Sequence, residues 1–387
     1  MKKTDNIGKA LIIDQHTTYS LPLIRALARR GYVVEIFAEP HSPAVHSNFC
    51  QKSILSPDFR EDKAAFSSAI GKVVQNGTYD VIYLCSEQVL PIILQIAPTA
   101  DCWRALPLTE PSDLSVLISK HAVLKRVAEA GVPIPRTIFP IDESEVSAAG
   151  GDIGYPLLLK GDRGEGSQQV RLVKKSDFLL PEYSQLAAMG EDRKILPCLQ
   201  EYLRGPKYTV AGLFDKGKPL RVMAYLSELS YPPTIGHTIK GVTENPPGLL
   251  GAAYKAFAAF RFTGLGNLEL IKDARDGEYK FLEINPRVWG NFGFAERAGV
   301  DLITPYRQLA EGNHVEPDLR FKTGIHYRRW LNDLRLVAKR PGRFSGFVAD
   351  SMKPMVFSDF SWGDLPAIFP IDYFMKRLIK KNSLQST

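Results

Sequence analysis

The chain has 387 residues, of which 44% are hydrophobic and 24% charged, and its formal net charge is +7 at pH 7. This length predicts two or three domains, and the hydrophobic content excludes long disorder as the default state. The longest apolar runs are far shorter than the roughly 20 residues that span a bilayer, and no signal-type stretch follows Met-Lys-Lys at the start. We therefore expect a cytoplasmic protein.

Alternating strand and helix patterns fill the first hundred residues. Apolar runs at 9–14, 32–39 and 79–86 indicate strands, and apolar residues at helical spacing indicate helices at 21–31 and 63–77. This alternation favours a Rossmann-like parallel sheet covered by helices. The first strand is not followed by G-x-G-x-x-G, so the fold carries no implication of NAD.

A second region begins after a proline-rich crossing near residue 105. We expect a helix at 119–132 that is capped by Ser119, and then two strands around a glycine-containing turn at 154–173. The pattern continues as strands over 194–226, a Pro/Gly-rich loop over 231–248, a helix over 249–261, and strands over 265–273 and 279–287. Asp215-Lys216-Gly217 and Asp276-Gly277 mark hairpin turns.

The cysteines and the basic residues indicate which metal sites and binding partners to expect. The four cysteines form no CxxC pair, which argues against a zinc knuckle or a disulfide framework. Eight Lys/Arg residues lie between Arg320 and Arg343, and a second basic cluster lies at 376–381. Solvated charge is the commonest meaning of such clusters, and no recognisable nucleic-acid module is present, so we expect no nucleic-acid partner.

Lys160 ends an apolar strand and is followed by the glycine-rich loop 161–167. Backbone N–H groups and one ammonium in such a loop suit polyphosphate oxygens. A surface lysine at a turn is the alternative explanation. The stretch is not a Walker A loop.

Two glutamates have matching settings on neighbouring predicted strands. Glu269 lies in NLELI and Glu283 in FLEIN, and Asn285 lies two residues after Glu283 on the same strand face. Carboxylate and amide oxygens suit Mg²⁺, which keeps its other positions for water and phosphate. The same pattern would arise if both glutamates lay on the solvent face of an amphipathic strand.

The order of these motifs resembles the ATP-grasp superfamily, most closely its carbamoyl-phosphate-synthetase-like carboxylate-amine ligases. A lysine at a helix start, a strand lysine with a glycine loop, QEYL at 200–203, GNLEL and EINPR follow one another within about 170 residues. The resemblance covers residues 1 to about 315. It implies an α/β and α+β architecture with a Rossmann-like domain (1–105), an ATP-grasp domain of two lobes clasping ATP (106–315, lid about 154–200) and a basic C-terminal extension (316–387).

The resemblance also implies roles for matching residues. Lys120 and Lys160 would contact the ATP phosphates, and Arg287 would act with Lys160 on the transferred phosphoryl group. Glu269, Glu283 and Asn285 would ligate one or two Mg²⁺ ions, with Mn²⁺ as an alternative. The remaining nucleotide contacts would come from the closing loop and from the segment that reads adenine: Gly164, Gly166, Ser167, Glu201, Tyr202 and Leu203.

Two departures from the family pattern stand out. Relatives often carry an acid shortly after QEY, where this chain has Gly205-Pro206-Lys207-Tyr208. The usual carboxylate contact near the ribose is therefore in question. The other departure is Asn291, where serine is common after the Trp-Gly pair.

The implied activity is an ADP-forming ligation of a carboxylate to an amine through an acylphosphate, in amino-acid or cell-surface glycan modification. The alternatives are a kinase-like enzyme that stops at a phosphorylated product and a non-catalytic nucleotide-binding scaffold. His237, Lys240 and Asn291 are candidate contacts for the small-molecule substrates, as are His16 and Thr17 at the end of the first strand.

The C-terminal tail leaves two alternatives. Residues 371–381 place apolar side chains on one helical face and lysines opposite, which suits docking on the protein's own core or peripheral contact with an anionic membrane. A homodimer is a further alternative for the state of the protein in solution.

Overall fold

The computed structural model describes residues 7–15, 19–96, 101–163, 169–190, 195–232, 236–352, 356–357 and 360–368. The chain divides into two compact units. Unit 1 comprises residues 1–107, 287–315 and 327–387, and unit 2 comprises residues 108–286 and 316–326. The contiguous boundaries expected near 105 and 315 stay a prediction, since unit 1 recruits two later segments of the chain.

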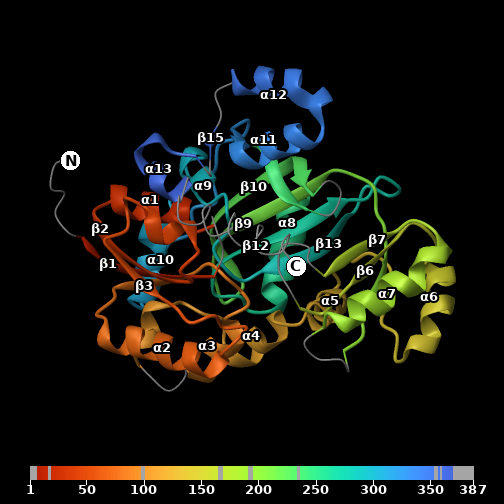
Figure 1. The fold of residues 1–387 in the computed structure, drawn as a ribbon, viewed down its shortest axis with the longest axis horizontal. Helices are drawn as coiled ribbons and strands as arrows, with labels where there is room; N and C mark the ends of the chain where they lie inside the picture. Colours follow the sequence, from red (N-terminus) through yellow and green to blue (C-terminus); the bar gives the residue numbers. More distant parts are fainter. Residues whose placement is uncertain are drawn as a thin grey trace, which may run out of the picture. The chain divides into compact units, whose positions relative to one another are not determined.

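Unit 1 is built on a parallel sheet with the strand order β3-β2-β1-β4. The strands are β1 (Gly8–Asp14), β2 (Tyr32–Ala38), β3 (Lys52–Leu55) and β4 (Val81–Leu84), and the first helices are α1 (Leu21–Arg29), α2 (Lys63–Asn76) and α3 (Leu90–Ile96). Figure 1 shows α2 and α3 together on one side of this sheet and α1 on the other. Helices on both faces explain why β1 and β4 are apolar and buried. The predicted parallel α/β sheet is confirmed, whereas His16 and Thr17 lie outside the described residues.

Later segments complete unit 1. They form α9 (Gly293–Arg297), α10 (Ile303–Ala310), β14 (His326–Arg328, whose first residue belongs to unit 2), α11 (Trp330–Lys339), α12 (Phe344–Ser351), β15 (Val356–Phe357) and α13 (Leu365–Ile368). Asp364, fully buried just before α13, accepts hydrogen bonds from Arg25 Nε (2.8 Å) and from the Asn48 backbone N–H (2.8 Å). The described part of the basic tail is therefore anchored in the N-terminal unit.

The amphipathic stretch 371–381 lies outside the described residues, so its docking stays a prediction. In the described ranges, the helices are all too short or too polar to cross a membrane.

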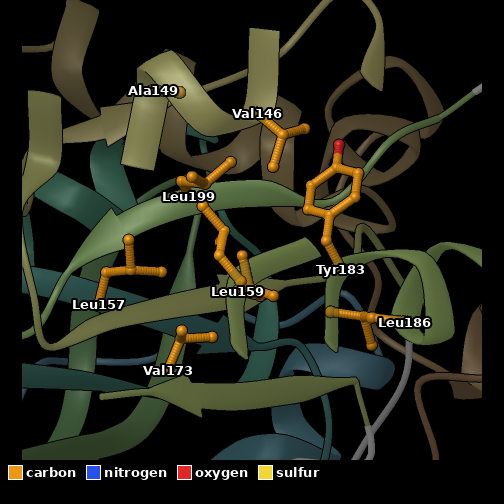
Figure 2. Packing of buried hydrophobic residues seen from close by; sticks show 9 residues of the cluster. Val146, Ala149, Leu157, Leu159, Val173, Tyr183, Leu186 and Leu199 are labelled. Atoms are coloured by element: carbon orange, nitrogen blue, oxygen red, sulfur yellow. The ribbon is translucent and has the colours of Figure 1, made fainter. Parts of the chain in front are cut away.

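Unit 2 contains two sheets, of which the smaller has the strand order β5-β8-β6-β7. Its elements are β5 (Thr137–Ile138), α6 (Val146–Ile153), β6 (Leu157–Lys160), β7 (Val170–Val173), α7 (Leu179–Ala188) and β8 (Cys198–Glu201). Figure 2 shows Leu157, Leu159 and Leu199 of the sheet packed with Val146 of α6 and Tyr183 of α7. Because side chains alternate along a strand, Lys160 lies on the face opposite this core. The predicted strand pair around the glycine-containing turn is confirmed, since β6 and β7 are antiparallel.

The larger sheet of unit 2 has the order β13-β12-β9-β10-β11. Its antiparallel strands are β9 (Lys207–Asp215), β10 (Lys218–Tyr231), β11 (His237–Thr243), β12 (Gly264–Lys272) and β13 (Tyr279–Asn285), with helices α4 (Pro111–Leu117), α5 (Lys120–Glu129) and α8 (Leu249–Ala259). Phe257 of α8 stacks on Phe214 of β9, with ring centroids 3.7 Å apart, so α8 covers one face. Residues that alternate with Phe214, such as Thr209, lie on the other face.

The prediction for one segment of unit 2 is wrong. Residues 231–248 were predicted to be a loop, but His237–Thr243 form β11, which pairs with the end of β10. The stretch HTIKGVT does contain β-branched residues, but Lys240 and Gly241 interrupt the apolar alternation. Cross-strand pairing with β10 stabilises the strand despite this weak local pattern.

Candidate functional site

A row of polar side chains crosses the open face of the larger sheet in unit 2. Glu269 on β12 lies directly opposite Glu283 on β13 and directly opposite Thr209 on β9. In the next row on the same face, Asn267 lies opposite Asn285, whose Nδ2 donates to Asn267 Oδ1 at 3.1 Å. The register thus brings two carboxylates and two amides from adjacent strands onto one surface, as the spacing of Glu269, Glu283 and Asn285 predicts.

The two carboxylates interact electrostatically. Burial raises the pKa of the Glu269 carboxyl, the charge of Glu283 raises it further, and the ammonium of Lys207 opposes the rise. Lys207 Nζ lies 3.0 Å from Glu269 Oε2 and 3.1 Å from the carbonyl oxygen of Gly236. The basic residue that departs from the family pattern therefore contacts one of the three predicted metal ligands.

Lys160 links the smaller sheet to this row of acids. Burial lowers the pKa of its ammonium, whereas the charges of Glu283 and Glu269 raise it, and nearby Lys120 lowers it. Lys160 of β6 is thus close enough to both carboxylates of the larger sheet to interact with them through charge, and Lys120 at the start of α5 interacts with Lys160. Lysines opposite carboxylates suit a ligand that carries both anionic groups and a divalent cation.

The start of α5 is held in place by Asp162, just after β6. The Asp162 Oδ1 atom accepts hydrogen bonds from the Ser119 hydroxyl (2.6 Å) and from the backbone N–H of His121 (3.0 Å), and the Asp162 carbonyl accepts from the backbone N–H of Lys120 (2.9 Å). Ser119 in turn accepts from the Ala122 N–H, as the predicted cap requires. These bonds fix the backbone of Lys120 relative to the end of the strand that carries Lys160.

The segment expected to read adenine begins at Glu201, whose polar groups are already engaged. Its Oε1 accepts from the backbone N–H of Arg136 (2.9 Å), its Oε2 lies 2.9 Å from Arg275, and its own N–H donates to the Arg136 carbonyl (2.9 Å). The Glu201 side chain therefore holds the segment in position, and Tyr202 and Leu203 follow it directly.

Arg287 and Asn291 belong to unit 1. The Arg287 guanidinium lies 5.4 Å from the centre of the Tyr19 ring, its Nε lies 3.7 Å from Glu87 Oε2, and only 8% of the residue is exposed. Asn291 is also buried, and its carbonyl accepts from the N–H of Phe294 at the start of α9. Their predicted roles stay predictions.

The substrate candidates His237 and Lys240 both lie on β11. Lys240 Nζ is 3.8 Å from Glu228 Oε2 on β10, and His237 lies opposite Tyr231. They are therefore strand residues and not members of an open loop. Gly164, Gly166 and Ser167 lie outside the described residues.

The donors present fit a hard divalent cation that shares its coordination with a ligand. Within the residues that the structure describes, no three His, Cys, Asp or Glu side chains cluster as a complete metal site. Glu269 and Glu283 face each other with Asn285 beside them. Mg²⁺ is commonly held by one or two carboxylates together with water and phosphate oxygens, so this incomplete set suits it better than zinc.

Sequence reasoning missed several residues of this surface. Asn267 shares the GNLEL motif with Glu269 and could have been found from the period of two along the strand. Thr209 is 1% exposed and its Oγ1 has no hydrogen-bond partner, but nothing in its local sequence sets it apart. Asp162 is visible only as one residue of a glycine-rich loop. Its contact with Ser119 requires the folded chain.

The comparisons with known proteins agree with this architecture. The family model described as "ATP-grasp in the biosynthetic pathway with Ter operon" matches residues 196–332, which include β9–β13. Biotin carboxylase 1 of Bacillus subtilis (strain 168) is 23% identical over 370 residues, covering 87% of this chain and 77% of the relative. The biotin carboxylase of Nostoc sp. is 25% identical over 224 residues, covering 53% of this chain and 48% of the relative. The chain thus spans about half the length of several curated relatives.

Solved structures show the same fold. The ADP complex of PurK, an N5-carboxyaminoimidazole ribonucleotide synthetase, has a TM-score of 0.67 at 14% identity, covering 93% of this chain and 92% of that one. An L-amino acid ligase from Bacillus licheniformis has a TM-score of 0.61 at 17% identity, covering 80% and 75%.

The fold and the facing lysines and carboxylates define an ATP-grasp architecture, as the motif order predicts. Residues 196–332 match an ATP-grasp family model, and over a longer stretch the chain is similar to ATP-grasp carboxylate-amine ligases such as biotin carboxylase.

Proposed function

We propose that this protein is an ATP-dependent, ADP-forming ligase that joins a carboxylate to an amine through an acylphosphate. One observation carries the proposal: Lys160 acts by charge on Glu269 and Glu283, which lie opposite each other on adjacent strands of the larger sheet. Phosphoryl transfer from ATP needs this pairing, with cationic groups for the phosphates and hard oxygen donors for the metal ion.

Each step has a residue to perform it. Lys120 and Lys160 neutralise phosphate charge. Glu269, Glu283 and Asn285 would hold Mg²⁺, which would act as a Lewis acid on the phosphate groups of ATP. Arg287 stabilises the transferred phosphoryl group. The loop with Gly164, Gly166 and Ser167 closes over the phosphates.

The chemistry proceeds by two substitutions. A carboxylate oxygen of the substrate attacks the γ-phosphorus, the bond to the β–γ bridging oxygen breaks, and ADP leaves. The amine nitrogen then attacks the carbonyl carbon, the C–O bond to phosphate breaks, and the nitrogen loses a proton as the amide forms. Water must be excluded between the steps because it would hydrolyse the acylphosphate.

Adenine recognition falls to Tyr202 and Leu203. The Glu201 carboxylate and N–H are engaged by Arg136 and Arg275, so we assign the contacts with the base to the two residues that follow. Arg275 also bonds Asp273 in a bidentate manner (Nε–Oδ1 3.0 Å and Nη2–Oδ2 2.6 Å), so the segment is tied to the β12–β13 turn.

The substrates are small molecules, and the matching family model is described by a biosynthetic pathway. One structural neighbour is an L-amino acid ligase, which favours an amino acid as one substrate. We expect the substrates to be contacted by His237, Lys240 and Asn291.

The test is an ADP-release screen of amino acids and sugar acids, supplied singly and in pairs with Mg-ATP. Release that needs both a carboxylate and an amine supports the ligase. Release with no amine, together with a stable phosphorylated product, would establish the kinase-like alternative, and nucleotide binding with no release for any pair would favour the scaffold.

A further inference from the structure

Lys207 is placed by strand register on the same face as the carboxylates. It lies opposite Ile271 at the start of β9, and Thr209, two residues later, lies opposite Glu269. Alternation therefore directs Lys207, Thr209 and Glu269 to one side of the sheet. The Nζ atom lies 3.0 Å from Glu269 Oε2, and its side chain is only 18% exposed.

The ammonium is held from two directions. It donates to the Glu269 carboxylate and to the carbonyl oxygen of Gly236, at 3.0 and 3.1 Å. Charge-assisted bonds at these distances from two different segments fix a flexible lysine side chain better than one bond would. Lys207 is thus part of the site and is not a solvent-exposed surface lysine.

A lysine at this place changes the charge that metal ions meet. Glu269 and Glu283 together carry two negative charges when ionised, and Lys207 reduces their sum to one. Like charges a few ångströms apart repel each other in a partly buried site, so the ammonium disfavours a divalent ion beside it. It also donates to Glu269 Oε2, one of the two carboxylate oxygens that such an ion could bind.

We propose that the Lys207 ammonium takes the place of one of the two divalent ions that this site could hold, so that the protein binds ATP with a single Mg²⁺. The inference rests on the proposed function and deepens it. Glu283 and Asn285 would hold the single ion, and the ammonium of Lys207 would neutralise Glu269. The ATP-grasp pattern allows one or two ions, and the lysine selects one.

The experiment counts ions directly. Mn²⁺ replaces Mg²⁺, and electron paramagnetic resonance titration measures Mn²⁺ bound per chain in the presence of a non-hydrolysable ATP analogue. Lys207→Met removes the charge and keeps a long side chain. Lys218→Met, at an exposed lysine on β10 of the same sheet, is the matched control, and Lys207→Arg restores the charge.

We expect one Mn²⁺ per chain for the wild type, Lys218→Met and Lys207→Arg, and two for Lys207→Met. Two ions on the wild type, or one ion on Lys207→Met, would overturn the proposal. Thermal melting without metal is a second readout: Lys207→Met should melt below Lys218→Met, because it leaves Glu269 without its cation. A wild type that binds no Mn²⁺ with the analogue, at any concentration tested, would instead contradict the proposed function itself.

Discussion

The Asp162 carboxylate accepts a hydrogen bond from the Ser119 hydroxyl at 2.6 Å, across 43 positions of the sequence. Ser119 caps α5, which begins with Lys120, and Asp162 follows the strand that ends in Lys160. One short contact therefore sets the relative positions of the two lysines expected to bind ATP phosphates.

Replacing Asp162 with alanine should weaken ATP binding without removing any residue that touches the nucleotide. It should also reduce the free energy of unfolding by about 1–2 kcal/mol, because it breaks a helix-capping network that is largely buried. Calorimetric ATP titration and urea unfolding measure the two effects. Asp142→Ala, at a surface cap of another helix in unit 2, is the control and should leave ATP affinity unchanged. Equal ATP affinity in both variants would refute the positioning role.

Glu283→Gln should leave the fold intact and abolish Mg-dependent turnover. The amide keeps the side-chain shape but loses the charge that holds the metal ion, a loss of several kcal/mol at the transition state. ADP release and thermal melting test the two statements. Glu278→Gln, an exposed glutamate just before the same strand, should keep wild-type turnover. Near-normal ADP formation by Glu283→Gln would count decisively against the assigned site.

Gly205→Ala should destabilise unit 2 by about 1–3 kcal/mol, because its φ of 153° and close approach to the Lys272 carbonyl leave no room for a Cβ atom. The segment 204–206 bonds β12 and its turn through Ala274 N–H to Arg204 O (2.9 Å) and Lys272 N–H to Pro206 O (3.0 Å). Gly251→Ala, in the open interior of α8, should instead stabilise by about 0.5–1 kcal/mol. Urea unfolding distinguishes the two, and the expectation fails if both glycines tolerate alanine equally.

Asp364→Asn should strongly destabilise unit 1. Asp364 and Arg25 form a buried pair, and removing one charge leaves the other uncompensated, which typically costs about 3–5 kcal/mol. The measurement is thermal unfolding. Asp318→Asn breaks the exposed pair with Arg320 and should leave the melting temperature unchanged. A small effect at Asp364 would mean that the end of the chain does not support the N-terminal unit.

His121 should make stability depend on pH. Burial lowers the pKa of its imidazole, and Asp162 only partly opposes this. The unfolded chain therefore takes up the proton first as the pH falls below about 6.5, so the free energy of unfolding falls there and levels off below the native pKa. Urea unfolding from pH 8 to pH 5 should show a smaller decrease for His121→Gln than for the wild type. Identical pH profiles would exclude His121 as the source.

Much of the fold could be predicted because its signals are local. The apolar run before Lys160 and the alternation around Glu269 and Glu283 assigned these residues to strands, and the structure has Glu269 opposite Glu283. The strand His237–Thr243 could not be predicted in this way, because its stability comes from pairing with β10.

By itself, the sequence determined the succession of strands and helices, the place of Lys160 at the end of a strand, the neighbouring strands of Glu269 and Glu283, and the ATP-grasp class. Periodicity and motif order, which carry these predictions, are properties of short segments. Only the tertiary structure decided that Asp162 holds the start of α5, that Asp364 anchors the tail to Arg25, and that Lys207 reaches Glu269. These contacts join residues 43, 339 and 62 positions apart. Their geometry follows from how distant segments pack and pair, which no local pattern records.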